Sequence, residues 1–139
     1  MRQLDFEKLE VWKRSCRLSC DLYQLLDACK NYGFKDQLTR SALSIASNIA
    51  EGEERETAKE SARFLYIAKG SAGEAITQLY IGIEAGFLDK QKGLALINEA
   101  KEISAMLASL IKIRKGYVRE DFAEYLGETK SEVLGKSRS

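Results

Sequence analysis

The chain has 139 residues, 45% of them apolar, and a net charge of +1, which is enough for one domain with one core. It contains no histidine, and this excludes the usual general base near neutral pH, the usual zinc ligand and every Ser-His or Cys-His nucleophile pair. Its start is charged and no apolar run approaches the length of a membrane span, so we expect a cytoplasmic protein. These properties favour a protein that is not an enzyme and holds no metal or cofactor.

The first predicted helix covers residues 5–30 and begins at Asp5, an acceptable N-cap residue. Two apolar stripes run along it at helical spacing: the first consists of Leu9, Trp12, Cys16, Ser19, Tyr23 and Leu26, and the second of Val11, Leu18, Leu22, Leu25 and Cys29. One helix of a monomeric bundle needs only one such stripe. The second stripe therefore predicts a further burial surface, most simply another subunit.

All three cysteines, Cys16, Cys20 and Cys29, lie on this first helix. An odd count without an export signal predicts reduced thiols. Cys16 and Cys20 are four residues apart, but no histidine or third nearby thiol completes a metal site. We therefore expect the cysteines to pack in the core or in an interface, as small apolar side chains do.

The second predicted helix covers residues 34–51 and the third covers residues 58–85, with an acidic hinge between them. Gly52 is the expected C-terminal stop of the second helix. Thr57 and Glu60 form a capping box. In such a box the Thr57 side chain accepts a hydrogen bond from the backbone amide of Glu60, and the Glu60 side chain accepts one from the backbone amide of Thr57. This box predicts the start of the third helix.

Serines interrupt the apolar pattern of the second helix. Ser41, Ser44 and Asn48 form one file on this helix, with Ser47 beside it. Neither a histidine nor a Ser-x-x-Lys pattern accompanies these hydroxyls, so a catalytic serine is the least favoured interpretation. Close packing is favoured: the hydroxyls bond back to helix carbonyls, a facing helix comes near, and Asn48 bridges to another element. Whether these contacts lie within one bundle or between subunits stays open.

A second patch of small residues, Gly-Ser-Ala-Gly at 70–73, lies inside the third helix. Two glycines inside a helix cost about 1 kcal/mol each against alanine, and this predicts close approach of another backbone. Glu74 follows the patch, and counting back from the hinge places it level with Lys35 and about one turn from Arg40. An ion pair between the two helices and a solvated glutamate both remain open.

A fourth predicted helix begins after Asp89 and reaches residue 115. The complete absence of proline favours helix throughout, and short loops make neighbouring helices antiparallel. We therefore expect an all-α, antiparallel up-and-down four-helix bundle over residues 1–115. Residues 116–139 are expected to form a C-terminal tail with a frayed end. This tail is either disordered or partly helical, with a short amphipathic helix marked by Phe122, Tyr125, Leu126 and Val133.

Two clusters of basic residues are candidates for nucleic-acid binding: Lys13, Arg14 and Arg17 on the first helix, and Lys112, Arg114, Lys115 and Arg119 near the end of the fourth. Cations at a helix C-terminus are ordinary, because they suit the helix dipole and keep the surface soluble. A net charge of +1 gives the monomer no global positive field, but a symmetric oligomer repeats each cluster and concentrates its charge. Plain solvated surface and an RNA- or DNA-binding surface therefore both remain open.

Three segments resemble the bacterial four-helix-bundle family called 23S ribosomal RNA intervening-sequence proteins: the start with Phe6, Leu9 and Trp12, residues 36–52 reading DQLTRSALSIASNIAEG, and residues 64–82 reading FLYIAKGSAGEAITQLYIG. The resemblance covers residues 6–112. It implies a left-handed up-and-down bundle that assembles as a cyclic homopentamer, and the family has no established biochemical function. The positions that match the family pattern, for which structural or interface roles are expected, are Arg40, Asn48, Glu51, Gly52, Gly70, Ser71 and Glu74.

The family is distantly similar to the accessory variability proteins of diversity-generating retroelements, which are pentamers with basic surfaces that engage nucleic acid and a reverse transcriptase. Similarity of fold does not transfer function. The sequence therefore leads to two alternatives. The first is a non-enzymatic homo-oligomer that binds RNA or DNA, and the second is a structural or adaptor protein that binds a protein partner without nucleic acid.

Overall fold

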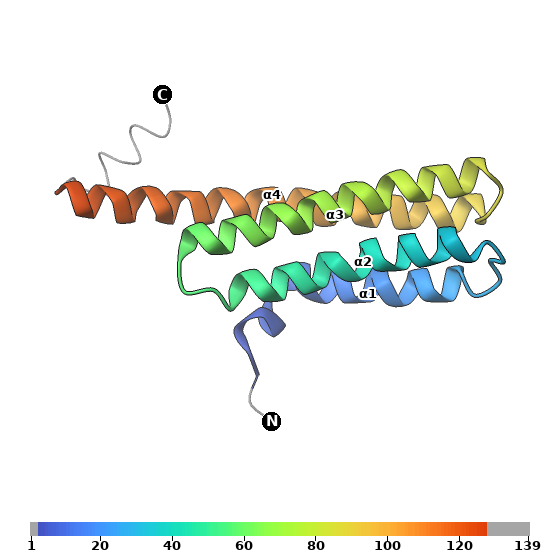
Figure 1. Cartoon of the computed structure of the whole chain (residues 1–139), viewed down its shortest axis with the longest axis horizontal. Coiled ribbons are helices and arrows are strands. Elements are labelled where there is room, and N and C mark those ends of the chain that lie inside the picture. The colour runs from blue at the N-terminus through green and yellow to red at the C-terminus, as the bar shows by residue number, and fades with distance from the viewer. Residues whose placement is uncertain (1–2, 128–139) are drawn as a thin grey trace.

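The computed structural model describes residues 3–127, which form four α-helices preceded by a 3₁₀ turn (Figure 1). The elements are η1 Asp5–Lys8, α1 Glu10–Leu25, α2 Tyr32–Glu53, α3 Ala58–Glu84 and α4 Lys90–Leu126. Consecutive helices run in opposite directions; α1 packs beside α2 and α4, and α3 packs beside the same two helices. The described residues contain no β-strand. The predicted all-α, up-and-down four-helix bundle is therefore confirmed.

The core lies along the bundle axis and is built of apolar side chains from all four helices. Its largest fully buried members are Leu18, Leu22, Leu26, Leu38, Ile45, Ile49, Leu65, Leu79, Ile97, Ile103 and Leu107. Burial of each such side chain stabilises the fold by about 1.5–3 kcal/mol. On α3 the residues Ala68, Ala72 and Ala75 are also fully buried, and their small side chains allow α2 and α4 to pack close to this helix.

The first helix is shorter than predicted, and the second of its two stripes faces the core. α1 begins at Glu10, so the predicted N-cap residue Asp5 lies in η1 instead. The buried members of the second stripe are Val11, Leu18, Leu22 and Cys29. The first stripe is mixed, and its Tyr23 is half-exposed. The ring of Phe6 meets the ring of Trp12 edge-on with centroids 5.2 Å apart, which fastens η1 to α1.

Side-chain caps set the starts of the other three helices. Asn31, Thr57 and Asp89 each accept a hydrogen bond from the backbone amide three residues later, at 3.1, 3.1 and 2.9 Å. The cap at Thr57 and the helix start after Asp89 were predicted, whereas Asn31 starts α2 earlier than the sequence indicated. The other half of the predicted capping box is absent among the described contacts, and the Glu60 carboxylate lies 4.0 Å from Arg63 instead.

Close approach between helices occurs at Gly52, Gly82 and Gly93. An added Cβ atom at Gly52 would lie 3.1 Å from a carbonyl oxygen of α3. At Gly82 it would lie 2.4 Å from an aromatic ring of α2, and at Gly93 it would lie 2.8 Å from an isoleucine of α3. At Gly70 and Gly73, by contrast, an added Cβ would meet no described atom within 4 Å. The prediction of close backbone approach at these two glycines is therefore wrong within this chain, because α3 presents both of them to the surface.

Two helix ends also differ from the predictions. α2 continues to Glu53, so Gly52 is a buried residue of the helix and not its stop. α4 continues past residue 115 and ends before Gly127, whose left-handed conformation, with a φ of 80°, terminates the helix. In Figure 1 the C-terminal part of α4 extends beyond the ends of the other helices. The side chains of Phe122 and Tyr125 and the end of the predicted tail lie outside the described residues.

Candidate functional site

The serine file of α2 forms a hydrogen-bonded seam with α3. Ser44 Oγ lies 2.8 Å from Ser71 Oγ of α3, and Ser41 Oγ donates to the Gln37 carbonyl oxygen at 3.0 Å. The Asn48 amide nitrogen donates to the Ser44 carbonyl and hydroxyl oxygens at 2.8 and 2.9 Å. Among the described residues, Asn48 thus makes no direct hydrogen bond to α3 and is linked to it through Ser44. The predicted back-bonding and close packing are confirmed, and they hold one bundle together.

Glu74 lies at the outer edge of this seam. Among residues 3–127 it forms no ion pair with Lys35 or Arg40, and its carboxylate accepts a hydrogen bond from Ser41 Oγ at 3.4 Å. Arg40 pairs with Asp36 of its own helix at 3.0 Å. Of the two interpretations of Glu74, the exposed glutamate is the one observed.

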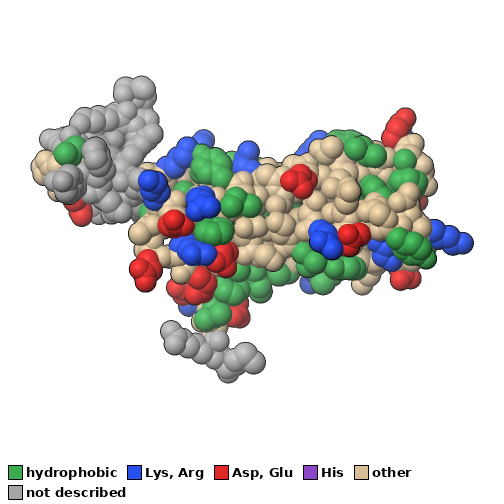
Figure 2. Space-filling model, in the orientation of Figure 1, with side chains coloured by type: hydrophobic (Ala, Val, Ile, Leu, Met, Phe, Trp, Pro, Cys, Tyr) green, Lys and Arg blue, Asp and Glu red, His purple; other side chains and the backbone are tan. Residues whose placement is uncertain are grey.

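An open groove of ≈ 490 Å³ lies over the seam. Its lining residues are Gln37, Arg40, Ser41, Ser44, Ile67, Ser71, Glu74 and Gln78. Figure 2 views the molecule from the side of α2 and α3, and the middle of this side is mostly tan, with a few charged side chains among the tan ones. Three residues of the family pattern line this groove: Arg40, Ser71 and Glu74. Its hydroxyls bond to one another, to backbone or to a carboxylate, which is a packing arrangement and not an activated nucleophile.

Two of the predicted basic residues hold helices together. Arg14 Nε donates to Glu99 Oε2 of α4 at 2.9 Å, and the same guanidinium pairs with Glu102. Hydrogen bonding to these carboxylates raises the pKa of Arg14, and Arg14 in turn lowers the pKa of Glu99. Arg114 pairs with Glu53 of α2 at 2.5 Å and donates to a hydroxyl of α3 at 3.2 Å. These arginines neutralise carboxylates between helices.

The remaining predicted basic residues do not form one cluster. Lys13, Arg17, Lys112 and Lys115 are exposed, and Arg119 belongs to α4 with its side chain outside the described part. Arg14 meets α4 at Glu102, which is about 15 Å along that helix from Lys112. The α1 and α4 groups are therefore separate in one protomer.

Exposed lysines that the sequence analysis did not single out join Lys112 and Lys115. Together they form what we name the lysine face, on the outer side of α3 and α4: Lys59, Lys69, Lys90, Lys101, Lys112 and Lys115, with Tyr66 and Tyr80 among them. Lys101 Nζ donates to the Tyr80 hydroxyl at 3.0 Å, and Lys115 Nζ lies 5.0 Å from the centre of the Tyr66 ring. A spacing of seven residues from Lys59 to Tyr66, Gly73 and Tyr80 was the available signal, because such residues share one side of a helix.

The outer side of α1 and α2 is apolar. Tyr23 and Leu43 are exposed there, and Trp12 and Cys16 are half-buried. Burial raises the pKa of the Cys16 thiol, and the neighbouring Cys20 acts in the same direction, so this thiol stays protonated near neutral pH. Packing in the core, one of the two roles predicted for the cysteines, is confirmed for Cys29.

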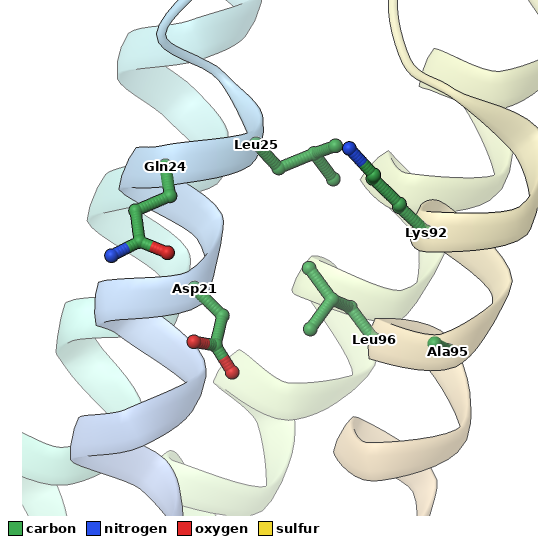
Figure 3. Close-up of a pocket in the computed structure, with 6 residues that line it drawn as sticks. All are labelled: Asp21, Gln24, Leu25, Lys92, Ala95 and Leu96. Carbon is green, nitrogen blue, oxygen red and sulfur yellow. The ribbon is translucent and has the colours of Figure 1, made fainter.

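A smaller groove of ≈ 340 Å³ separates α1 from α4 (Figure 3). Leu25 and Leu96 point toward it from the two helices, and Asp21 and Lys92 lie at its edges. None of the predicted site residues lines it. Among the side chains that the structure describes, no group of three or more Cys, Asp or Glu is arranged to hold a metal ion. No helix in the described part of the chain is long and apolar enough to cross a membrane.

Comparison with known proteins places these features in a family. The family profile described as 23S rRNA-intervening sequence protein matches residues 7–109, which include the serine seam, Gly70 and Gly73. A crystal structure described as a protein with unknown function from the S23 ribosomal protein family of Bacteroides thetaiotaomicron is similar over 73% of this chain and 98% of its own, with 25% sequence identity and a TM-score of 0.70. No curated protein matches the chain. The chain therefore belongs to the family of 23S rRNA-intervening sequence proteins.

Proposed function

We propose that this chain is a non-enzymatic protein that assembles head to tail into a closed homo-oligomer, a pentamer, which binds nucleic acid through exposed basic residues. The observation that carries the assembly is that two neighbouring sides of the bundle expose large apolar side chains. Tyr23 is 47% and Leu43 44% exposed on the α1–α2 side, and Ile67 is 42% and Ile81 55% exposed on the α2–α3 side. Apolar surface of this kind on a small domain is typical of protein interaction sites.

Helical spacing places the two pairs on different sides of the bundle. Ile67 lines the groove over the α2–α3 seam, and Ile81 follows it on α3 about four turns later. Tyr23 follows the half-buried Cys16 of α1 by seven residues, about two turns. Leu43 lies about 100° around α2 from Ser44, which faces α3.

A contact between two different sides of one protein is heterologous, and it forms a ring when the rotation from copy to copy closes. Adjacent sides of a four-helix bundle face about 90° apart, so a ring closes after about four or five copies. The pentamer implied by the family resemblance lies in this range.

Assembly would also strengthen nucleic-acid binding. One protomer has a net charge of +1, but a ring repeats its exposed cations around an axis and raises the local positive potential. Arg14 and Arg114 are engaged with carboxylates, so these two predicted basic residues are the least able to meet phosphates. The family description refers to 23S rRNA, which makes RNA the first ligand to test. An adaptor that binds a protein partner would form the same oligomer without retaining RNA.

Light scattering coupled to size exclusion tests the assembly. We expect a mass near five times the 15.6 kDa of one chain. Tyr23→Lys and Ile81→Lys should each give monomers, because a buried ammonium without a partner opposes the contact. Ile113→Lys changes a comparably exposed residue of α4 outside both sides and should leave the mass unchanged. A mixture of Tyr23→Lys and Ile81→Lys should form dimers, since each variant keeps the side that the other has lost.

Three outcomes would count against the proposal. A wild-type mass near 15.6 kDa at micromolar concentration would contradict assembly. A variant mixture that stays monomeric would show that these two sides do not contact each other. RNA retention no better than that of an acidic control protein would remove nucleic-acid binding and favour the adaptor alternative.

A further inference from the structure

We infer that the lysine face, on the outer side of α3 and α4, binds single-stranded nucleic acid. The inference rests on the nucleic-acid binding proposed above and assigns that binding to one surface. Four of its six lysines, Lys59, Lys69, Lys90 and Lys101, belong to neither of the basic clusters that the sequence suggested.

Contacts across the two helices establish the face as one surface. Lys115 of α4 lies over Tyr66 of α3, and Lys101 of α4 reaches the ring and hydroxyl of Tyr80 of α3. Lys69 follows Tyr66 by three residues, so the two side chains are neighbours on α3. By the same rule Lys112 neighbours Lys115 on α4. Cations from both helices thus flank two aromatic rings.

The charge of the lysine face is not neutralised within the described part of the chain. Among the described side chains, which exclude those of residues 117–122 and 125, every ion pair involves an arginine, namely Arg14, Arg40, Arg55, Arg63 or Arg114. None of the six lysines has a carboxylate partner there. Glu99 and Glu102 of α4 turn toward α1 to meet Arg14, so they lie away from the face. A row of unpaired ammonium groups complements a phosphate backbone.

Gly70 and Gly73 leave the surface between the two tyrosines open. Neither glycine has a described atom within 4 Å of a Cβ position, so packing inside the chain does not account for them. Absence of a side chain lets a ligand backbone approach the helix closely. Gly70 and Gly73, which were expected to face another helix, are therefore assigned the role of letting the ligand approach α3.

The combination of exposed rings and cations points to a single strand. Tyr66 and Tyr80 are half-exposed, and an unpaired base can stack on such a ring while the adjacent ammonium meets its phosphate. The two tyrosines are about 21 Å apart along α3, a distance that several nucleotides can span. A duplex hides the faces of its bases and would use the lysines alone.

The lysine face stays free in the proposed ring. Assembly uses the α1–α2 and α2–α3 sides, whereas the lysine face lies opposite the α1–α2 side. Each copy would therefore present its own strand-binding surface, and binding does not require a site shared between copies.

Fluorescence anisotropy with a labelled 20-nucleotide oligouridine tests the face. The variant Lys69→Gln/Lys101→Gln/Lys112→Gln should bind at least tenfold more weakly, and the slope of log affinity against log salt should fall by about 2, near 0.7 for each lost phosphate contact. The matched control Lys13→Gln/Arg17→Gln/Lys30→Gln removes three exposed cations of the α1 region and should stay within about twofold of wild type.

Tyrosine variants test stacking separately from charge. Tyr66→Leu/Tyr80→Leu should weaken oligouridine binding by on the order of tenfold per ring, whereas Tyr66→Phe/Tyr80→Phe keeps both rings and should retain binding. Binding of a blunt RNA duplex without a loop should be insensitive to the Leu substitutions. Oligothymidine provides the DNA arm, and its binding should depend on the same tyrosines. Circular dichroism melting checks that each variant is folded.

The outcomes separate this inference from the proposed function. If the control triple variant alone lost oligouridine binding, or if both triple variants lost it equally, the assignment of binding to the lysine face would be wrong. The proposal that the protein binds nucleic acid would still stand. Unchanged oligouridine binding in the folded Leu variant would overturn stacking and thus the assignment to single strands. If the wild-type protein bound none of the three ligands, both the proposed nucleic-acid binding and its assignment to the lysine face would be wrong.

Discussion

The seams between the helices and the lysine face use the same residue types in opposite ways. In the seams, Gly82 lets an aromatic ring of α2 approach, and Arg114 pairs with a carboxylate. On the lysine face, Gly73 faces open space, and Lys69 has no carboxylate partner among the described residues. A glycine or a cation is therefore structural where another helix covers it and available to a ligand where none does.

The largest expected effect separates the two kinds of glycine. Gly82→Leu should lower the free energy of unfolding by about 3 kcal/mol, because even the Cβ atom would lie 2.4 Å from the Phe34 ring and 2.8 Å from Leu88. Gly73→Leu is the matched control on the same helix, and it should raise stability by up to about 1 kcal/mol through helix propensity. Urea denaturation measures both. Equal destabilisation would show that Gly73 is also packed against another element.

A smaller effect separates the two kinds of cation. Arg114→Met should cost about 2 kcal/mol, because it leaves Glu53, whose side chain is only 12% exposed, without its partner. Lys112→Met removes an exposed cation of the same helix and should change stability by less than about 0.5 kcal/mol. The double variant Arg114→Met/Glu53→Gln should recover part of the loss in urea denaturation. If Arg114→Met matched Lys112→Met in stability, the partly buried ion pair would contribute nothing measurable.

The smallest effect concerns pH. Hydrogen bonding to Arg14 lowers the pKa of Glu99 in the folded protein. A carboxylate of this kind contributes stability above its unfolded pKa of about 4.3, and the contribution is lost as pH falls through the lower folded pKa. The melting temperature should therefore fall on acidification below about pH 5, and it should fall less in Glu99→Gln. Glu84→Gln, on an exposed residue, is the control; the same acid sensitivity in Glu99→Gln as in wild type would contradict the role of this pair.

Local rules predicted much of the fold. Thr57 and Asp89 were recognised as helix starts because a cap depends on three or four consecutive residues. The end of α4 was placed too early, since Gly116 alone does not stop a helix whose later residues still favour it, whereas Gly127 adopts the left-handed conformation that does. Helical spacing identified the serine file of α2, although the partner of Ser44 on α3 became visible only when the two helices were packed.

By itself, the sequence determined that the chain forms four antiparallel helices, because helical periodicity, capping and short loops are all properties of neighbouring residues. Only the tertiary structure decided which cations are neutralised and which are free. Arg14 and Glu99 are 85 residues apart, and Lys101 and Tyr80 belong to different helices, so their contacts depend on how the helices pack. The same packing covered Gly82 and left Gly73 open, and this difference separates the bundle's core from its proposed binding surface.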